Sequence, residues 1–254
     1  MDPMTMFETI RNKRVLVTGG GSGIGASIAE LFAQQGAVVG IHYHANKSSM
    51  ELLAGKSGFQ NRKTFIIQAD LLNSKQRDAL IPSFINQAGR IDVLVNNAGA
   101  ILGTDHFLKL DQKSWDATLT LNLTAPFFLA RDAFSFMKDH GGGRIINISS
   151  IAAKYGGSSS SLHYGAAKAG IEAVTRTLAR DGAGYNILVN AIEPGVIDTD
   201  FHKKIGRASL AERVKTIPLK RAGVPLDIAR LCLFLAAESG DYMTGQVLGV
   251  TGGD

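Results

Sequence analysis

Tyr164 and Lys168 have the types and the spacing that proton chemistry requires. They are four positions apart in SLHYGAAKAGIEAVTR (residues 161–176), a stretch rich in Ala, Gly and aliphatic residues. Side chains at this spacing share one face of a helix and lie within contact range. A free tyrosine has a pKa of about 10, and a cation fixed about one helical turn away favours the phenolate. The pair predicts a tyrosine that exchanges a proton near neutral pH; an amphipathic helix with an ordinary surface Tyr and Lys is the alternative.

A glycine-rich loop follows the first apolar run of the chain. The run RVLVT (14–18) leads into TGGGSGIG (18–25), which opens a helical pattern. Glycines allow a tight turn and a close approach to a pyrophosphate, whose charge meets free N–H groups at the positive end of a helix. A flexible loop is the alternative, but a position between a strand and a helix is the context that dinucleotide binding requires. We therefore predict a dinucleotide site that includes Gly19, Ser22, Gly23, Ile24 and Gly25.

The end of the second apolar run bears on which dinucleotide binds. An acidic side chain at this point would hold a ribose 2′-hydroxyl, whereas a basic one would accept a 2′-phosphate. The chain reads HYHANKS (42–48) here and contains no acid. We predict NADP(H), its phosphate held by His44, Lys47 and Ser48. NAD stays as the alternative, because the glycine loop offers Ser22 where an arginine would favour the phosphate.

Short β-branched runs alternate with longer helical patterns along the chain. The runs are nearly continuous in apolar character, which indicates strands buried on both faces. They occupy residues 14–18, 37–43, 63–69, 92–96, 144–149, 187–192 and 246–250. This alternation predicts a doubly wound, Rossmann-type α/β fold, with a parallel sheet of seven strands and helices on both faces. Ligands bind such a sheet at the carboxyl ends of its strands.

Length and composition limit the function classes. With 254 residues, 45% hydrophobic and 19% charged, the chain has the size and composition of one globular domain. No apolar stretch approaches the roughly 18 residues of a membrane span, and the N-terminus lacks the apolar core of a signal peptide, so we expect a cytoplasmic protein without a membrane partner. Cys232, the single cysteine, lies among helix-spaced aliphatic residues and is expected to be a buried structural thiol.

The net charge of +5 raises nucleic acid or an anionic ligand as a partner. Most basic residues are scattered, and no reading helix or aromatic–basic surface is recognisable, so we expect no nucleic-acid partner. We also expect no metal ion at the site. Basic residues are concentrated in one stretch, residues 203–221, which contains seven Lys or Arg and a single acid, Glu212.

Taken together, these motifs resemble the short-chain dehydrogenase/reductase family over essentially the whole chain. The resemblance rests on motifs that follow successive strands in the family's order. They are TGGGSGIG (18–25), Asp70, NNAG (96–99), Asn122, Ser149-Ser150, Tyr164-x-x-x-Lys168, and Pro194-Gly195 with Thr199. The family implies one NAD(P)-binding Rossmann domain over residues 1–254 and hydride transfer between a nicotinamide cofactor and a carbonyl or secondary alcohol.

The resemblance also implies roles for individual residues. Tyr164 would be the proton donor in reduction and the base in oxidation, and Lys168 would lower its pKa and hold the nicotinamide ribose. Ser150 would hydrogen-bond the substrate oxygen, and Asn122 would support a water relay to the lysine.

The remaining cofactor contacts come from the same resemblance. Asp70, with Leu71 beside it, would hold the adenine amino group, although Asp70 could instead cap the helix that follows. The chain would pass the adenosine ribose at Asn97, Ala98 and Gly99, and the nicotinamide at Pro194, Gly195, Ile197 and Thr199.

Two positions near the tyrosine stay open. The segment from Ser150 to Tyr164 is one residue longer than is usual in the family, so either Ser149 or Ser150 faces the substrate. We choose Ser150, because Ser149 more naturally ends the strand. His163 could touch substrate, but we expect it to face solvent near the helix start.

The activity most typical of this pattern is reduction of 3-oxoacyl thioesters on acyl carrier protein. A sugar or polyol dehydrogenase is the alternative within the family, and a catalytically silent dinucleotide-sensing regulator is the alternative outside enzymes. The basic stretch 203–221 would attract an acidic carrier, a coenzyme A phosphate or an anionic small substrate, although a solvated helix face is the simpler explanation. Residues 112–138 are apolar on more than one face, and family members are usually tetramers, so we expect a homotetramer.

Overall fold

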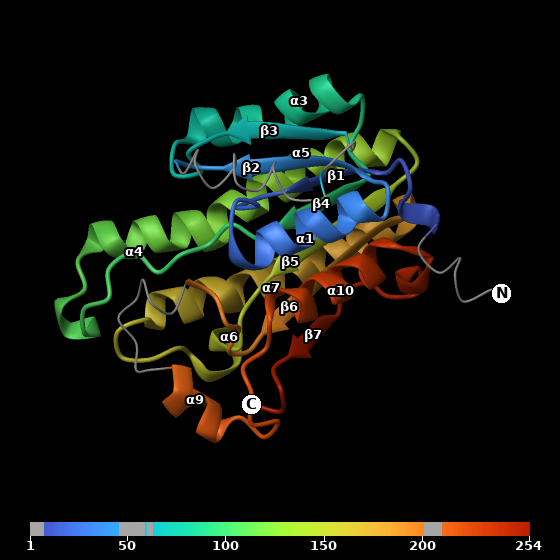
Figure 1. Cartoon of the computed structure of the whole chain (residues 1–254). Helices are drawn as coiled ribbons and strands as arrows, with labels where there is room; N and C mark the ends of the chain where they lie inside the picture. The colour runs from blue at the N-terminus through green and yellow to red at the C-terminus, as the bar shows by residue number, and fades with distance from the viewer. Residues whose placement is uncertain (1–7, 46–58, 60–62, 201–209) are drawn as a thin grey trace.

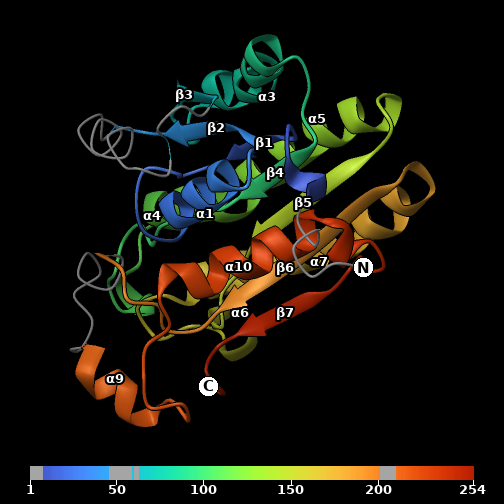
Figure 2. The same ribbon diagram turned by 45° about the vertical axis from the view of Figure 1, so that its right-hand side comes forward.

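Seven parallel strands form one sheet, in the order β3-β2-β1-β4-β5-β6-β7 (Figures 1 and 2). The structure is a computed structural model and describes residues 8–45, 59, 63–200 and 210–254. The strands are β1 (Arg14–Val17), β2 (Val38–Tyr43), β3 (Thr64–Gln68), β4 (Val93–Asn96), β5 (Gly143–Ile148), β6 (Ile187–Pro194) and β7 (Val247–Val250). Each lies within two residues of the range that its apolar run predicts. The predicted doubly wound α/β fold is confirmed.

Helices cover both faces of the sheet. The helices of the described residues are α1 (Gly23–Gln34), α3 (Ser74–Ala88), α4 (Gln112–Leu119), α5 (Ala125–Asp139), α6 (Ala152–Tyr155), α7 (Leu162–Gly182), α9 (Leu210–Thr216) and α10 (Pro225–Ala236). Helices α1 and α10 pack together on one face, whereas α3, α5 and α7 lie on the other (Figure 2). Short 3₁₀ turns occupy Glu8–Ile10, Phe107–Lys109, Ala183–Tyr185 and Glu238–Gly240.

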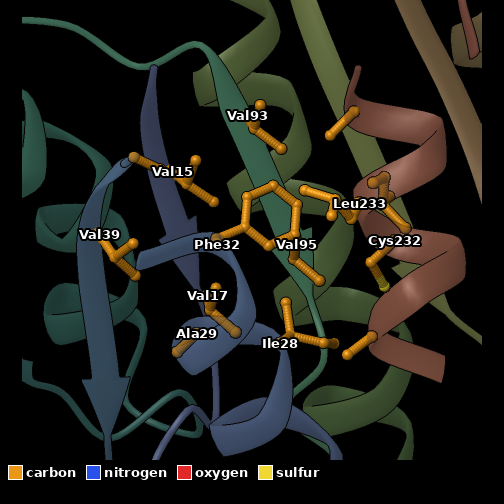
Figure 3. Close-up of a cluster of buried hydrophobic side chains, with 14 of the residues drawn as sticks. Val15, Val17, Ile28, Ala29, Phe32, Val39, Val93, Val95, Cys232 and Leu233 are labelled. Carbon is orange, nitrogen blue, oxygen red and sulfur yellow. The ribbon is translucent and has the colours of Figure 1, made fainter. Parts of the chain in front are cut away.

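The core between the sheet and the pair α1 and α10 is aliphatic. Val15, Val17, Val93 and Val95 of the central strands pack against Phe32 and its neighbours (Figure 3). Cys232 of α10 is fully buried in this cluster, and burial raises the pKa of its thiol above the ordinary range. The prediction of a buried structural thiol is confirmed. No helix among the described residues is long and apolar enough to span a membrane.

The strand order reverses between β1 and β4, which are adjacent in the sheet although two strands separate them in the chain. Two loops leave the carboxyl ends of this pair in opposite directions, so the backbone opens at that edge. The glycine loop follows β1, and the loop of Asn97, Ala98 and Gly99 follows β4. Asp70 follows β3, Ser149 and Ser150 follow β5, and Gly195 follows β6, so these predicted site residues lie at the carboxyl ends of the neighbouring strands.

Candidate active site

The glycine loop is closely packed against its own helix. Gly19 has a φ of +62°, and a Cβ atom at Gly25 would lie 2.3 Å from the carbonyl oxygen of Gly19. Both positions therefore require glycine. The first turn of α1 contains no acidic residue, and Ser22 at its N-cap forms no side-chain capping bond. The positive end of this helix thus has no counter-charge from its own first turn, which suits a pyrophosphate.

Hydrogen bonds fix the two loops of the opening to each other. The hydroxyl of Thr18 accepts bonds from the backbone N–H groups of Asn97 (2.9 Å) and Ala98 (3.0 Å). The Asn97 amide in turn donates to the carbonyl oxygens of Thr18 (2.9 Å) and Gly19 (3.1 Å). The structure therefore brings the two predicted cofactor loops into one rigid edge.

The predicted adenosine residues lie beyond β2 and β3. Nε2 of His44 is 3.9 Å from Oδ1 of Asp70. Lys47 and Ser48 lie outside the described residues. The carboxylate of Asp70 accepts a bond from the N–H of Leu72 (2.9 Å), and the N-cap of α3 is Asn73. Asp70 is therefore not the helix cap, the role that the sequence left open for it.

Leu71 is buried in the core cluster beneath α3, with 3% of its surface exposed. A ligand beside this residue can therefore meet its backbone but not its side chain.

Lys168 is buried under the carboxyl end of β5. Its ammonium donates a 2.7 Å hydrogen bond to the carbonyl oxygen of Ile148 and lies 5.4 Å from the centroid of the Tyr164 ring. Burial lowers the pKa of Lys168 to about 8. The expected contact between the tyrosine and the lysine on one face of α7 is present.

Asn122 lies in a π-helical turn, Thr120–Thr124, between α4 and α5. Its amide donates to the carbonyl oxygens of Ala100 (2.7 Å) and Thr118 (2.8 Å), whereas its buried Oδ1 has no hydrogen-bond partner among the described residues. A Cβ atom at Gly99 would lie 2.6 Å from that Oδ1 and 3.3 Å from Nζ of Lys168. The amide oxygen and the ammonium therefore face the same space in front of Gly99. A buried acceptor and a buried donor that converge there suit a polar ligand group or a bound water.

The two serines after β5 differ in their surroundings. Ser149 is buried, and its hydroxyl donates to Oε1 of Glu172 at 2.7 Å. Ser150 is half-buried, and its hydroxyl oxygen accepts a bond from the N–H of Ala152 at 3.1 Å. Because that bond leaves the hydroxyl hydrogen of Ser150 available, this serine is the better placed of the two to donate to a ligand.

The loop after β6 returns to the glycine loop. A Cβ atom at Gly195 would lie 2.7 Å from the Cα of Thr251, and the backbone of Ile197 pairs with Gly223. Further along, the methyl group of Thr199 would lie 3.3 Å from a Cβ atom at Gly23. Pro194, which ends β6, accepts a backbone bond from Ile151 at 3.0 Å. The predicted nicotinamide segment is thus in contact with the start of α1 and with the segment after Ser150.

The prediction that His163 faces solvent is wrong. Its side chain is fully buried, stacks on Trp115 at 6.5 Å between ring centroids, and places Nε2 at 3.1 Å from the carbonyl oxygen of Leu102. The residue lies near the helix start, as expected, but α4 and the loop after β4 cover it. These are contacts between distant segments, which the local sequence does not reveal.

Sequence reasoning missed a buried polar network behind the site. Asn96 donates to Asn147 (2.9 Å), and Asn147 donates to the hydroxyl of Thr175 (2.8 Å), which joins β4, β5 and α7. All three residues are buried. The signal was present, because an asparagine in a nearly continuous apolar strand requires a buried partner.

The chain is similar to known proteins over nearly its whole length. The model of one protein family, described as enoyl-(acyl carrier protein) reductase, matches residues 19–254. The chain is 38% identical to the 3-oxoacyl-[acyl-carrier-protein] reductase FabG of Chlamydia pneumoniae, over 98% of this chain and 99% of that protein. It is also 38% identical to the probable galactose dehydrogenase GalD of Rhizobium meliloti, over 99% of this chain and 98% of that protein.

A solved structure, a blue fluorescent protein from a metagenomic library in complex with NADPH, superposes with a TM-score of 0.89. It is 36% identical and covers 96% of this chain and 98% of that one. These matches extend over nearly the whole chain. The chain belongs to the short-chain dehydrogenase/reductase family.

Proposed function

We propose that the protein is an oxidoreductase that transfers a hydride between NADP(H) and a carbonyl or secondary alcohol, with 3-oxoacyl thioesters as its substrates. Support comes from the relative that reduces 3-oxoacyl groups and from the structural neighbour that binds NADPH. The observation that carries the proposal is the convergence of Lys168 Nζ and Asn122 Oδ1 on the space before Gly99, beside the Tyr164 ring.

The described residues fit a dinucleotide at the edge between β1 and β4. The glycine loop (Gly19, Ser22, Gly23, Ile24, Gly25) would hold the pyrophosphate at the start of α1, which lacks an acid in its first turn. Asp70 and the backbone of Leu71 would meet the adenine, and His44, with Lys47 and Ser48, would meet the 2′-phosphate. Asn97, Ala98 and Gly99 would border the adenosine ribose, and Pro194, Gly195, Ile197 and Thr199 the nicotinamide.

Proton transfer would be the work of this chain's own residues. Bound NADPH supplies the hydride. The hydroxyl of Ser150 donates a hydrogen bond to the substrate carbonyl, and Tyr164 gives its proton to the developing alkoxide. The ammonium of Lys168, 5.4 Å from the tyrosine ring, favours the phenolate that this transfer leaves. Asn122 holds a water between its Oδ1 and Lys168, through which the proton is replaced.

The test is NADPH consumption by the purified protein with a panel of 3-oxoacyl thioesters, ketoses and aromatic ketones. We expect turnover to be fastest with the thioesters, and NADPH to be preferred to NADH. Tyr164→Phe should lower kcat by about 10²- to 10⁴-fold, the usual contribution of a general acid, and should leave the NADPH dissociation constant within a few-fold. Turnover that survives in Tyr164→Phe would overturn the mechanism. NADPH binding without turnover on any substrate would instead indicate a sensing regulator.

The relative described as a probable galactose dehydrogenase supports a second candidate, oxidation of a sugar or polyol. The assay run in reverse, with aldoses and polyols and NADP⁺, separates the two. A kcat/KM higher with a sugar than with any thioester would replace the thioester assignment.

Several cations of the basic stretch 203–221 are already paired with carboxylates of this chain. Among residues 210–221, Arg213, Lys215 and Arg221 each pair with a carboxylate, at 3.2, 2.8 and 3.0 Å. The cations at 203–207 lie outside the described residues. Lys220 donates instead to the backbone carbonyl of Lys215, at 2.9 Å. Attraction of an acidic carrier would therefore depend on Lys220 and the cations at 203–207, and a kcat/KM that is unchanged by raised ionic strength would exclude it.

We further propose that the chain is one domain over residues 1–254, works in the cytoplasm and assembles as a homotetramer. The partly exposed aromatic residues of α5, Phe127, Phe128 and Phe134, support the assembly. Light scattering tests it, and a monomer would contradict it.

A further inference from the structure

His42 is a buried histidine near the carboxyl end of β2, beside the proposed cofactor site. The proposed mechanism does not use it. It is the fifth residue of β2, with 2% of its surface exposed. Its Nδ1 lies 3.1 Å from the backbone nitrogen of Gly19, and its Nε2 lies 3.0 Å from the carbonyl oxygen of Ala69. Its backbone carbonyl oxygen also accepts a bond from Gly20 at 2.9 Å. One residue thus contacts both segments that border the proposed adenosine site.

The two ring contacts permit a single neutral form. The N–H of Gly19 can only donate, so Nδ1 must carry no hydrogen, and the carbonyl of Ala69 can only accept, so Nε2 must carry one. An imidazolium would place a second N–H on Nδ1, pointing at the N–H of Gly19. Protonation therefore breaks the bond that holds the first glycine of the loop.

We infer that His42 positions the glycine loop for the dinucleotide, and that it does so only as the neutral Nε2–H tautomer. This inference rests on the proposed cofactor site. His42 is a positioning residue, because its ring contacts the loop and the end of β3 while the loop itself would contact the pyrophosphate. The residue that donates to the His42 ring must be glycine, because the φ of +62° at Gly19 and its packing against Ala98 exclude a side chain.

Burial and a neighbouring histidine both favour the neutral form of the His42 ring. Burial, opposed in part by the bond to Ala69 and reinforced by His44, lowers the pKa of His42 below its ordinary value. His44 lies just past the end of β2 and faces Asp70 after β3, while the glycine loop (residues 18–22) contains no titratable side chain. The ring is therefore neutral at pH 7, and cofactor affinity is expected to fall only at pH values below the ordinary histidine pKa of about 6.5.

The experiment measures NADP⁺ dissociation constants by calorimetry between pH 5 and pH 7.5, with NADP⁺ chosen because it is stable in acid. For the native protein, affinity should fall several-fold more toward pH 5 than for His42→Asn, whose Oδ1 can accept the Gly19 bond but does not titrate. Comparison at equal pH cancels the titration of the 2′-phosphate. His42→Leu, which can accept no bond, should weaken binding about ten-fold at pH 7.5. His140→Asn is the matched control, since His140 is an exposed residue after α5 and should leave both affinity and its pH dependence unchanged.

A pH dependence identical in the native protein and in His42→Asn would overturn the inference. If the variants fail to fold, ¹⁵N chemical shifts of the histidine rings of the native protein decide it, because a hydrogen on Nδ1 of His42 at pH 7.5 contradicts the proposed tautomer. A native protein that does not bind NADP⁺ at all would refute the proposed function, whereas binding without the acid-dependent difference would refute only the role of His42.

Discussion

The hydroxyl of Ser149 donates a 2.7 Å hydrogen bond to the carboxylate of Glu172, four residues beyond Lys168 on α7. The same hydroxyl lies 3.3 Å from the carbonyl oxygen of Lys168. Ser149 thus ties the end of β5 to the helix that carries the tyrosine and the lysine. The hydroxyl of its neighbour Ser150 still has a hydrogen that it can donate to a ligand. Ser149 is therefore the structural serine, and Ser150 is the candidate for substrate binding.

Alanine substitutions should separate the roles of these two serines. Ser150→Ala is expected to lower kcat/KM by ten-fold or more with little change in stability, because a donor to the substrate oxygen is lost. Ser149→Ala is expected to lower the free energy of unfolding by about 1–3 kcal/mol, because the partly buried carboxylate of Glu172 loses this hydrogen bond and keeps its pair with Arg176 at 3.7 Å. Urea unfolding and steady-state kinetics on both variants are the measurements. A Ser149→Ala variant that is stable and inactive would reverse the assignment.

Gly99 should tolerate no side chain, because the amide oxygen of Asn122 and the ammonium of Lys168 lie directly in front of it. The new Cβ of Gly99→Ala would lie 2.6 Å from Oδ1 of Asn122, whose amide is fixed by two hydrogen bonds. We expect kcat/KM to fall at least ten-fold, since Asn122 or the loop must shift by several tenths of an ångström away from Lys168. Gly184→Ala is the matched control, because nothing lies within 4 Å of its added Cβ. Equal activity in both variants would show that the space before Gly99 is not used.

The sheet was predictable because each strand is a short apolar run bounded by helical patterns. Buried parallel strands need continuous apolar character, so the seven runs identified the seven strands to within two residues. The contact of Tyr164 with Lys168 was predictable for a similar reason, since helical spacing alone brings them together.

The features that the sequence did not reveal depend on contacts between distant segments. The burial of His163 requires Trp115 and the loop at Leu102 to fold over the start of α7. The ring of His42 contacts residues 23 and 27 positions away. The π-helical turn that directs Asn122 toward Lys168 leaves no signature in a pattern of apolar residues that is otherwise helical.

The network of Asn96, Asn147 and Thr175 is expected to stabilise the sheet behind the site. Asn147→Ala removes the acceptor of Asn96 and the donor to Thr175, all in buried surroundings. The expected loss is about 1–3 kcal/mol in the free energy of unfolding. Thr175→Val and the double variant complete a mutant cycle by chemical denaturation. Strictly additive losses in the double variant would contradict a shared network.

Lys168 should lower the free energy of unfolding, although the proposed proton transfer requires it. Its ammonium is buried, and the cause of its lowered pKa, about 8, is desolvation. Lys168→Met should therefore abolish most activity and yet unfold at a higher urea concentration than the native protein at pH 7, with a gain on the order of 2 kcal/mol. The direction of the pH dependence follows from proton binding. Between pH 8 and about 10.4 the unfolded lysine holds a proton that the folded one has released, so the native protein gains stability relative to Lys168→Met as the pH rises through this window.

Urea unfolding of both proteins at pH 7 and pH 9.5 checks this difference, because other titrating groups are common to the two and cancel. The advantage of Lys168→Met should be largest at pH 7 and smaller at pH 9.5. An advantage that grows with pH would mean that the folded protein holds the ammonium more tightly than water does. The ammonium would then be stabilised by its hydrogen bond to Ile148.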